Sequence, residues 1–171
     1  YMKKTYKDKI SDKLVHAFVK NKIISPIPSK FTKKLTEADK FRKLCESKIK
    51  DPIIGFKAGG TGIPLMKKLR EKEPFVASVF SRNFITSGEK VKINKSTLGI
   101  ELEVCYLIKK SFFSFKGKLT TKNLNNFISH MASCIEVVGY RQKREGITSF
   151  GDLCSDFGGN IKFLIGKKKK F

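Results

Sequence analysis

The sequence predicts a mixed α+β fold in a single domain. Some segments alternate apolar and polar residues as strands do, and others repeat apolar residues at helical spacing. A chain of 171 residues can bury one core but is short for two. With 40% hydrophobic residues and fifteen Phe it is not a disordered polymer. Its apolar runs are too short for a membrane span, so we expect no transmembrane segment.

Two helices are expected in the first part of the chain. Residues 6–21 form the first, and the proline-containing residues 25–29 end it. Residues 36–39, Thr-Glu-Ala-Asp, resemble a capping box that starts the second helix. Residues 51–52, Asp-Pro, end that helix. The apolar side is formed by Ile10, Leu14, Ala17 and Phe18 in the first helix and by Phe41, Cys45 and Ile49 in the second.

The next segment predicts short strands around a helix. Residues 53–58 have the apolar character of a buried strand, which runs into the turn Gly-Gly-Thr-Gly at 59–62. This turn can hold an anion with its backbone N–H groups or be a plain strand-to-helix turn, and it lacks the ending of a phosphate-binding loop. Pro64 suits the first turn of a short helix. Short strands are expected at 75–80 and 91–94.

The most informative strand is the one expected at residues 98–108, which alternates like a half-buried strand. Alternation sends Glu101 and Glu103 to one face, about 7 Å apart, where they repel each other unless a cation or hydrogen bonds compensate. Glu136, in the apolar strand 134–138, would complete an oxygen-rich site for Mg²⁺ or Mn²⁺. The alternative interpretation is an exposed polar strand face. The opposite face receives Ile100, Leu102 and Val104.

The last elements complete one domain. Residues 120–132 predict a helix capped by the threonine pair 120–121, with its apolar residues inward. Residues 161–165 predict a final apolar strand. There are no internal repeats and no long linker. We therefore expect one domain over residues 1–166 and a basic C-terminal tail over residues 167–171, of a kind that is usually mobile.

Lys57 is a candidate acid–base residue because it ends an otherwise apolar strand. Desolvation there would lower the pKa of its ammonium group towards a useful range. The alternative is a lysine whose head group reaches the surface. His16 and His130 lie in helix-like segments without a ligand pattern, which favours structural roles.

The net charge and the cysteines indicate which partners and which compartment the chain has. A net charge of +22 predicts attraction to a polyanion, either RNA or an anionic lipid surface, or else a solvated surface of biased composition. No aromatic–basic pattern of an RNA-binding module is visible. The four cysteines show no Cys-x-x-Cys pair, which disfavours zinc and favours a reducing intracellular compartment, mitochondrial or cytoplasmic.

Taken in order, five stretches resemble the 2-oxopent-4-enoate hydratase and 4-oxalocrotonate decarboxylase branch of the fumarylacetoacetate hydrolase (FAH)-like superfamily. The resemblance runs from about residue 10 to residue 166 and depends on the order and spacing of the stretches together. The stretches are residues 35–39, 55–59, 99–104, 134–138 and the Asp156 region that ends at residues 163–166.

The resemblance implies a β-rich, barrel-like core with surrounding helices. It implies a divalent metal, Mg²⁺ or Mn²⁺, held by Glu101, Glu103 and Glu136, with Lys57 as the catalytic proton-transfer group. The implied substrate is a small 2-oxo acid (a 2-hydroxydienoate), whose carboxylate and 2-oxo group bind the metal. Water addition or decarboxylation then uses the stabilised dienolate.

The chain departs from the family pattern at several positions. Phe75 replaces an acidic residue after Pro74, and a phenylalanine transfers no proton. Residues 139–141 read Gly-Tyr-Arg instead of Asp-Ser-Arg, and residues 155–157 read Ser-Asp-Phe instead of Ala-Asp-Asn. The family's further C-terminal strands are expected to be missing, which would leave the barrel with open edges.

Two functions are therefore open at this stage. The first is a metal-dependent hydratase or decarboxylase-like enzyme with an eroded site. The second is a catalytically inactive subunit of a large assembly, such as a mitochondrial ribosome or a respiratory complex, in which other protein subunits cover the missing part. The acidic triad and Lys57 favour the enzyme, and the +22 charge and the departures favour the subunit.

Overall fold

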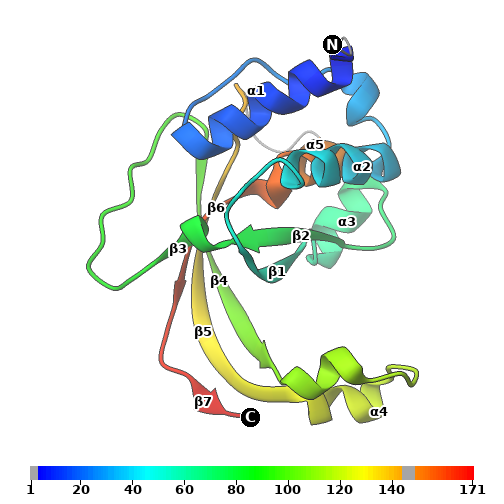
Figure 1. Cartoon of the computed structure of the whole chain (residues 1–171), viewed down its shortest axis with the longest axis vertical. Coiled ribbons are helices and arrows are strands. Elements are labelled where there is room, and N and C mark those ends of the chain that lie inside the picture. The colour runs from blue at the N-terminus through cyan, green and yellow to red at the C-terminus, as the bar shows by residue number, and fades with distance from the viewer. Residues whose placement is uncertain (1–3, 144–148) are drawn as a thin grey trace.

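The computed structural model describes residues 4–143 and 149–171, so residues 1–3 and 144–148 of the expected domain lie outside the described part. Helices pack at one end of the molecule, and a long β-hairpin extends from them to a separate lobe (Figure 1). One sheet has two strands, β1 and β2. The other has the order β3-β6-β5-β4, with β7 paired to β5. The predicted mixed α+β class is confirmed.

The first helix, α1, covers Tyr6–Lys20, close to the prediction. The Thr5 side chain accepts a hydrogen bond from the backbone N–H of Asp8 and so caps the helix. Asn21 ends it in the left-handed conformation. The inward face buries Leu14, Ala17 and Phe18, as expected.

The second helix, α2, covers Leu35–Glu46, and its expected capping box is wrong. The N-cap position is Lys34, without a side-chain cap, because Thr36 already lies inside the helix. The helix also ends at Glu46, well before the Asp-Pro pair. Its buried face holds charged residues beside the apolar ones: Ala38, Phe41, Arg42, Cys45 and Glu46.

Strands β1 (Ile53–Gly59) and β2 (Phe75–Phe80) form an antiparallel pair joined through α3 (Ile63–Leu69). β1 was expected to be buried, which is wrong: Ile54 and Phe56 are exposed. Of the strands that the structure describes, β1 pairs with β2 alone, so none covers its other edge. β2 lies inward and is mostly buried.

Strands β4 (Thr97–Ile108) and β5 (Ile128–Gly139) form the long hairpin, and β6 (Asn160–Ile165) pairs with β5. β3 (Phe84–Ile85) pairs parallel to β6, and the expected strand at 91–94 is not formed. The expected half-buried character of β4 is also wrong. β4 is the edge strand of its sheet, and both of its faces are largely exposed.

The far end of the hairpin is a lobe of short helical turns. The helix expected over residues 120–132 is reduced to α4 (Thr121–Leu124), because the chain enters β5 at Ile128. The basic residues that follow β6 include β7 (Lys169–Lys170), which pairs with the start of β5. The sequence reading also missed α5 (Phe150–Ser155), which packs on α2. Short 3-10 turns cover Ser29–Phe31, Ser81–Asn83, Lys110–Ser114, Asn125–Phe127 and Phe157–Gly159.

Aromatic side chains fill the core between the helices and β2. Phe18 packs against Phe80 and Phe157, with ring centroids 5.6 and 4.5 Å away. Phe75 packs edge-on against Phe150. All four cysteines are free thiols. No helix of the described residues is both long enough and apolar enough to cross a membrane.

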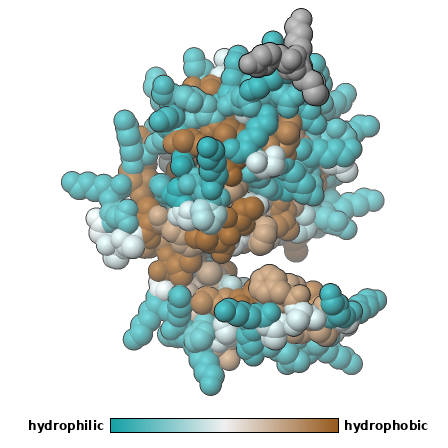
Figure 2. All heavy atoms as spheres, viewed as in Figure 1, coloured by the Kyte–Doolittle hydropathy of each residue, from teal (hydrophilic) through white to brown (hydrophobic). Residues whose placement is uncertain are grey.

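Hydrophilic side chains cover much of the face of the molecule that Figure 2 shows. Figure 2 shows them separated by apolar patches, with a hollow between the helical body and the lobe that carries α4.

Candidate metal centre

Three carboxylates meet on one face of the β4–β5 hairpin. The register pairs Glu101 with Glu136 and Glu103 with Cys134, so all three glutamates point to the same side of the sheet. One carboxylate oxygen from each lies within 4.8 Å of the others. The separation is small enough that rotation of the exposed Glu101 and Glu103 side chains can bring all three to one cation.

Glu136 is the buried member of this group, with a relative exposure of 1%. Its Oε1 accepts a hydrogen bond from Lys57 Nζ at 2.5 Å. Its Oε2 is buried and has no hydrogen-bond partner among the described residues. Burial raises the pKa of Glu136, the Lys57 ammonium opposes that rise, and Glu101 and Glu103 add to it. A buried acceptor without a donor is costly, so a further cation beside Oε2 would be stabilising.

Lys57 approaches this face from β1. Its backbone pairs with Ala77 of β2, and its side chain, 11% exposed, reaches across to the hairpin. The ammonium group is therefore engaged with Glu136 and does not extend freely into water. Gly158, at φ +69°, lies close to this lysine: a Cβ there would be 2.8 Å from Ala77 Cβ and 3.6 Å from Lys57 Cδ. The clash with Ala77 and the positive φ therefore favour glycine at this position, whereas the distance to Lys57 is an ordinary contact.

Phe75 forms an apolar wall beside Lys57. Its ring lies close to Gly158 and occupies the position that a Cβ of Gly59 would take. It is buried and packs against Phe150. The position where the resemblance implies an acidic group is thus occupied by a ring that excludes water and carries no proton.

A second buried ion pair lies at the end of β5 and was not recognised from the sequence. Asp156 accepts hydrogen bonds from the Arg141 backbone N–H at 2.8 Å and from Gln142 Nε2 at 2.8 Å. The Arg141 guanidinium lies 3.2 Å from Asp156 Oδ1 and stacks over Phe18. Burial lowers the pKa of Arg141, and Asp156 opposes this. These partners tie β5 to the end of α5, which is a structural role.

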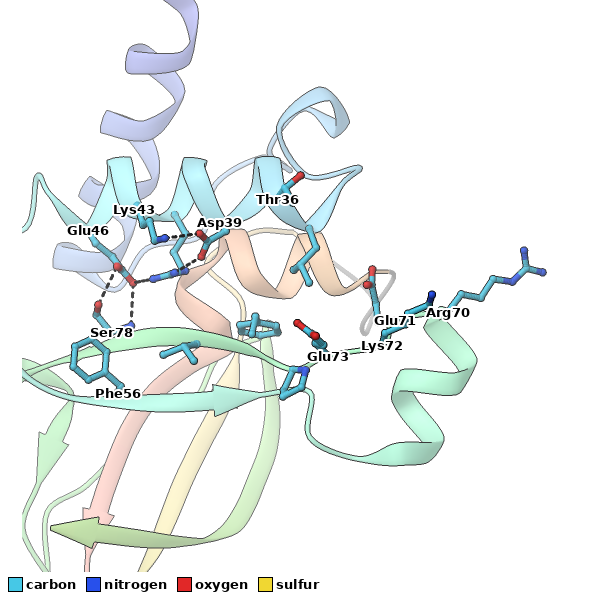
Figure 3. Close-up of a pocket in the computed structure, with 15 residues that line it drawn as sticks. Thr36, Asp39, Lys43, Glu46, Phe56, Arg70, Glu71, Lys72, Glu73 and Ser78 are labelled. Carbon is cyan, nitrogen blue, oxygen red and sulfur yellow. Dashed lines mark hydrogen bonds and ion pairs between the residues drawn. The ribbon is translucent and has the colours of Figure 1, made fainter. Parts of the chain in front are cut away.

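A groove lies elsewhere, between α2 and the strands β1 and β2, and has a volume of about 880 Å³. Figure 3 shows Lys43, Asp39, Glu46 and Ser78 along it, with Arg70 pointing away. Its buried charges are already paired. Arg42 binds Asp39 and Glu46, and Glu46 accepts from the backbone N–H and hydroxyl of Ser78. Burial raises the pKa of Asp39, but Lys43 and Arg42 outweigh this and leave it below its usual value. We therefore assign the charged residues of this groove a structural role.

The glycine turn after β1 leads directly into α3, whose N-cap is Gly62. Gly60 has φ +72°, and a Cβ there would collide with the Phe150 ring. The turn therefore fits the plain strand-to-helix interpretation.

No protein-family model and no curated protein matches the chain. Two solved structures match it over 99% of its length, both of 4-oxalocrotonate decarboxylase from Pseudomonas putida G7. The structure complexed with magnesium and adipate gives a TM-score of 0.74 at 13% identity. The structure complexed with calcium and acetate gives 0.77 at 15% identity. The chain spans 66% of the length of these structures. The likeness establishes the FAH-like fold that the resemblance implied.

Proposed function

We propose that this chain binds a divalent cation, Mg²⁺ or Mn²⁺, through Glu101, Glu103 and Glu136. We further propose that it acts there on a small 2-oxo acid, as a hydratase or decarboxylase. The observation that carries the proposal is Glu136, whose buried Oε2 has no donor among the described residues and whose carboxylate lies close to two more. Carboxylate oxygens are the ligands that these hard cations prefer.

The fold supports a cation of this kind. The two matched structures hold magnesium with adipate and calcium with acetate, so both combine a divalent cation with a carboxylate ligand. A carboxylate of the substrate would take the corresponding place here. Bound in this site, the cation would polarise the 2-oxo group and favour an enolate-like state.

The protein's own residues would then position and protonate the substrate. Lys57, held 2.5 Å from Glu136, is the group that can deliver or accept a proton beside the metal site. The buried Phe75 ring lies near Gly158, as Lys57 does, and makes this side of the site apolar. An apolar wall of this kind suits decarboxylation better than hydration, because decarboxylation needs no ordered water.

A second candidate function is a catalytically inactive subunit of a large assembly, bound to other proteins or to a polyanion such as RNA or an anionic lipid surface. Phe75 favours it, since the acidic residue implied by the resemblance is absent from the protein's described site. The net charge of +22 favours it as well.

Thermal unfolding with and without Mg²⁺ or Mn²⁺ tests the metal site. A cation at 100 times its Kd stabilises the folded chain by about 2.7 kcal/mol, which raises Tm by several degrees. Glu103→Gln should lose this rise, because it removes a charged ligand without changing side-chain size. Glu73→Gln, at an exposed glutamate of the groove rim, is the matched control and should keep it. An equal rise in the Glu103→Gln variant would contradict the site.

Assays separate the two functions. We expect the metal-loaded protein to consume 2-oxopent-4-enoate or 4-oxalocrotonate, measured by ultraviolet absorbance, and Lys57→Met to abolish turnover while keeping the metal-dependent rise in Tm. Metal binding without turnover of either acid would support the inactive subunit.

A further inference from the structure

The lobe at the far end of the β4–β5 hairpin carries positive charge and no negative charge. We call residues 109–127 the basic lobe, which contains the short helical turns of that end of the molecule. Its five lysines are all exposed: Lys109, Lys110, Lys116, Lys118 and Lys122. The sequence has no Asp or Glu between Glu103 and Glu136, although the whole chain has 15. The lobe therefore has no carboxylate of its own to compensate its charge.

The lack of carboxylates, more than the density of lysine, distinguishes the basic lobe from the helical body. Lysines of the body have acidic neighbours, as Lys40 does in its ion pair with Glu37. Among the described residues, no carboxylate forms an ion pair with a lysine of the lobe. Ammonium groups that lack a carboxylate partner in their own chain attract an external polyanion.

The C-terminal lysines add to this charge because they are held at the same end of the hairpin. The strand β7 pairs with the start of β5, directly after the lobe. Phe171 ends the segment: its backbone N–H donates to the Ser129 carbonyl at 3.1 Å, and its ring packs edge-on against Tyr106. The four consecutive lysines at residues 167–170 therefore lie beside the basic lobe (Figure 1).

Apolar side chains protrude among the lysines of the basic lobe. The core of the lobe is formed by Phe112 and Phe115, which pack on the buried ring of Phe127 with centroids 5.6 and 4.8 Å away. Three further side chains are 78%, 43% and 43% exposed: Phe113, Leu119 and Leu124. These three lie largely outside the core of the lobe, so they can contact a partner without unfolding it.

Lysine beside exposed Phe and Leu fits an anionic lipid surface better than it fits RNA. A lysine ammonium is a compact point charge that suits lipid headgroups, and apolar side chains enter the boundary between headgroups and acyl chains. Leu119 and Leu124 offer no ring on which a base could stack. Residues 109–127 also contain no Arg, Tyr, Trp or His, which are the residues that RNA-binding surfaces use beside Phe.

We propose that the basic lobe binds an anionic phospholipid surface, with Phe113 entering the bilayer interface and the surrounding lysines contacting the headgroups. The attachment is interfacial and needs no membrane-spanning segment. The two contributions add, so both the anionic headgroups and the apolar ring are needed for stable binding. This binding is independent of the metal centre, because Glu136 is held by Lys57 of the helical body and not by the lobe.

Fluorescence of the Phe113→Trp variant tests the insertion, because the chain has no tryptophan of its own. The nuclease-treated protein is mixed with vesicles of phosphatidylcholine alone or of equimolar phosphatidylcholine and phosphatidylserine. We expect a blue shift of the emission and quenching by brominated lipid only with the phosphatidylserine vesicles, strong at about 0.1 M NaCl and weaker at about 0.5 M. Phe56→Trp, at a phenylalanine of β1 that is 70% exposed, is the matched control and should show neither change.

Vesicle co-sedimentation measures the contribution of charge. The double variant Lys116→Gln with Lys118→Gln should weaken binding to the phosphatidylserine vesicles about tenfold or more, since one lysine near an anionic surface contributes about fivefold. Lys67→Gln with Lys68→Gln removes the same charge from exposed positions of α3 in the helical body and should weaken binding much less. Circular dichroism checks that all variants fold.

Several outcomes would overturn the proposal. One is an emission of the Phe113→Trp variant that anionic vesicles leave unchanged, and another is an equal response of the Phe56→Trp variant. Equal losses of binding in the two lysine double variants would show unspecific attraction by the whole chain. Binding to poly(U) without any response to vesicles would identify RNA as the partner. A blue-shifted emission without vesicles that moves to the red on dilution would show that a second copy covers Phe113 instead.

Discussion

At the scale of single residues, the Lys57–Glu136 pair is the feature most in need of explanation. Both side chains are nearly buried, and their ion pair joins β1 to the hairpin. A buried ion pair is not an efficient way to stabilise a fold, because apolar residues of similar size are often as good or better. The free Oε2 of Glu136 adds a further cost. A role in binding a cation and moving a proton accounts for both features.

Removal of the lysine charge should expose this cost. In Lys57→Met, Glu136 stays buried without its cation, which should lower the free energy of unfolding by about 3–5 kcal/mol. Urea denaturation in the presence of EDTA measures this effect. The double variant Lys57→Met with Glu136→Leu should recover most of the loss, since no buried charge remains. A loss below 1 kcal/mol in the single variant would mean that water reaches Glu136 and that the site is more open than described.

At the scale of elements, the sequence predicts the existence of those helices and strands that have a clear local pattern. The apolar stripe of α1, the alternation of β4 and the apolar run at residues 134–138 of β5 predict these elements, and the structure contains all three. The same alternation places Glu101 and Glu103 on one face. Their approach to Glu136 depends on the β4–β5 register, which a hairpin with a long connecting lobe does not reveal in sequence.

The failures share a physical cause, which is that tertiary context decides burial and helix length. β1 and β4 have apolar residues but lie at sheet edges, so the sequence overstates their burial. The stripe over residues 120–132 fits a helix, yet pairing with β4 draws the chain from Ile128 onwards into β5. The N-cap of α2 was expected at Thr36 but lies at Lys34, two residues earlier. The Lys34 side chain makes no cap hydrogen bond, so no local capping motif marks this end of the helix.

The ion pairs of Asp12, which join α1 to the segment after α2, should make the stability of the fold depend on pH. Asp12 binds Lys4 and Lys48, at 2.7 and 2.8 Å, and these partners hold its pKa below its ordinary value. A lowered pKa gives stability that is present above the ordinary value near 3.8 and is lost as pH falls through the folded value. The Asp12 side chain is 36% exposed, and solvent screens its ion pairs, so we expect less than about 1 kcal/mol from it.

Urea unfolding at pH 7 and pH 3 compares the chain with Asp12→Asn. The variant should be slightly less stable at pH 7, and the difference should shrink at pH 3, which lies below the ordinary pKa of 3.8 that Asp12 has in the unfolded chain. A difference that stays constant with pH would show that the loss comes from packing and not from charge.

At the scale of the whole molecule, charge and apolar surface are separated. The lysines cover the helical body, the lobe and the segment with β7, while β4 and β5 carry none. One side of the hairpin carries the acidic cluster, and the other side exposes the apolar residues Ile100, Leu102 and Val104 of β4.

The most direct test of the central claim is a crystal structure of the chain grown with Mn²⁺, with anomalous diffraction used to locate the ion. The account expects one strong peak within bonding distance of Glu101, Glu103 and Glu136, with Lys57 still beside Glu136. Absence of a peak there at saturating Mn²⁺, or a peak bound by other residues only, would contradict the metal site and the function proposed from it.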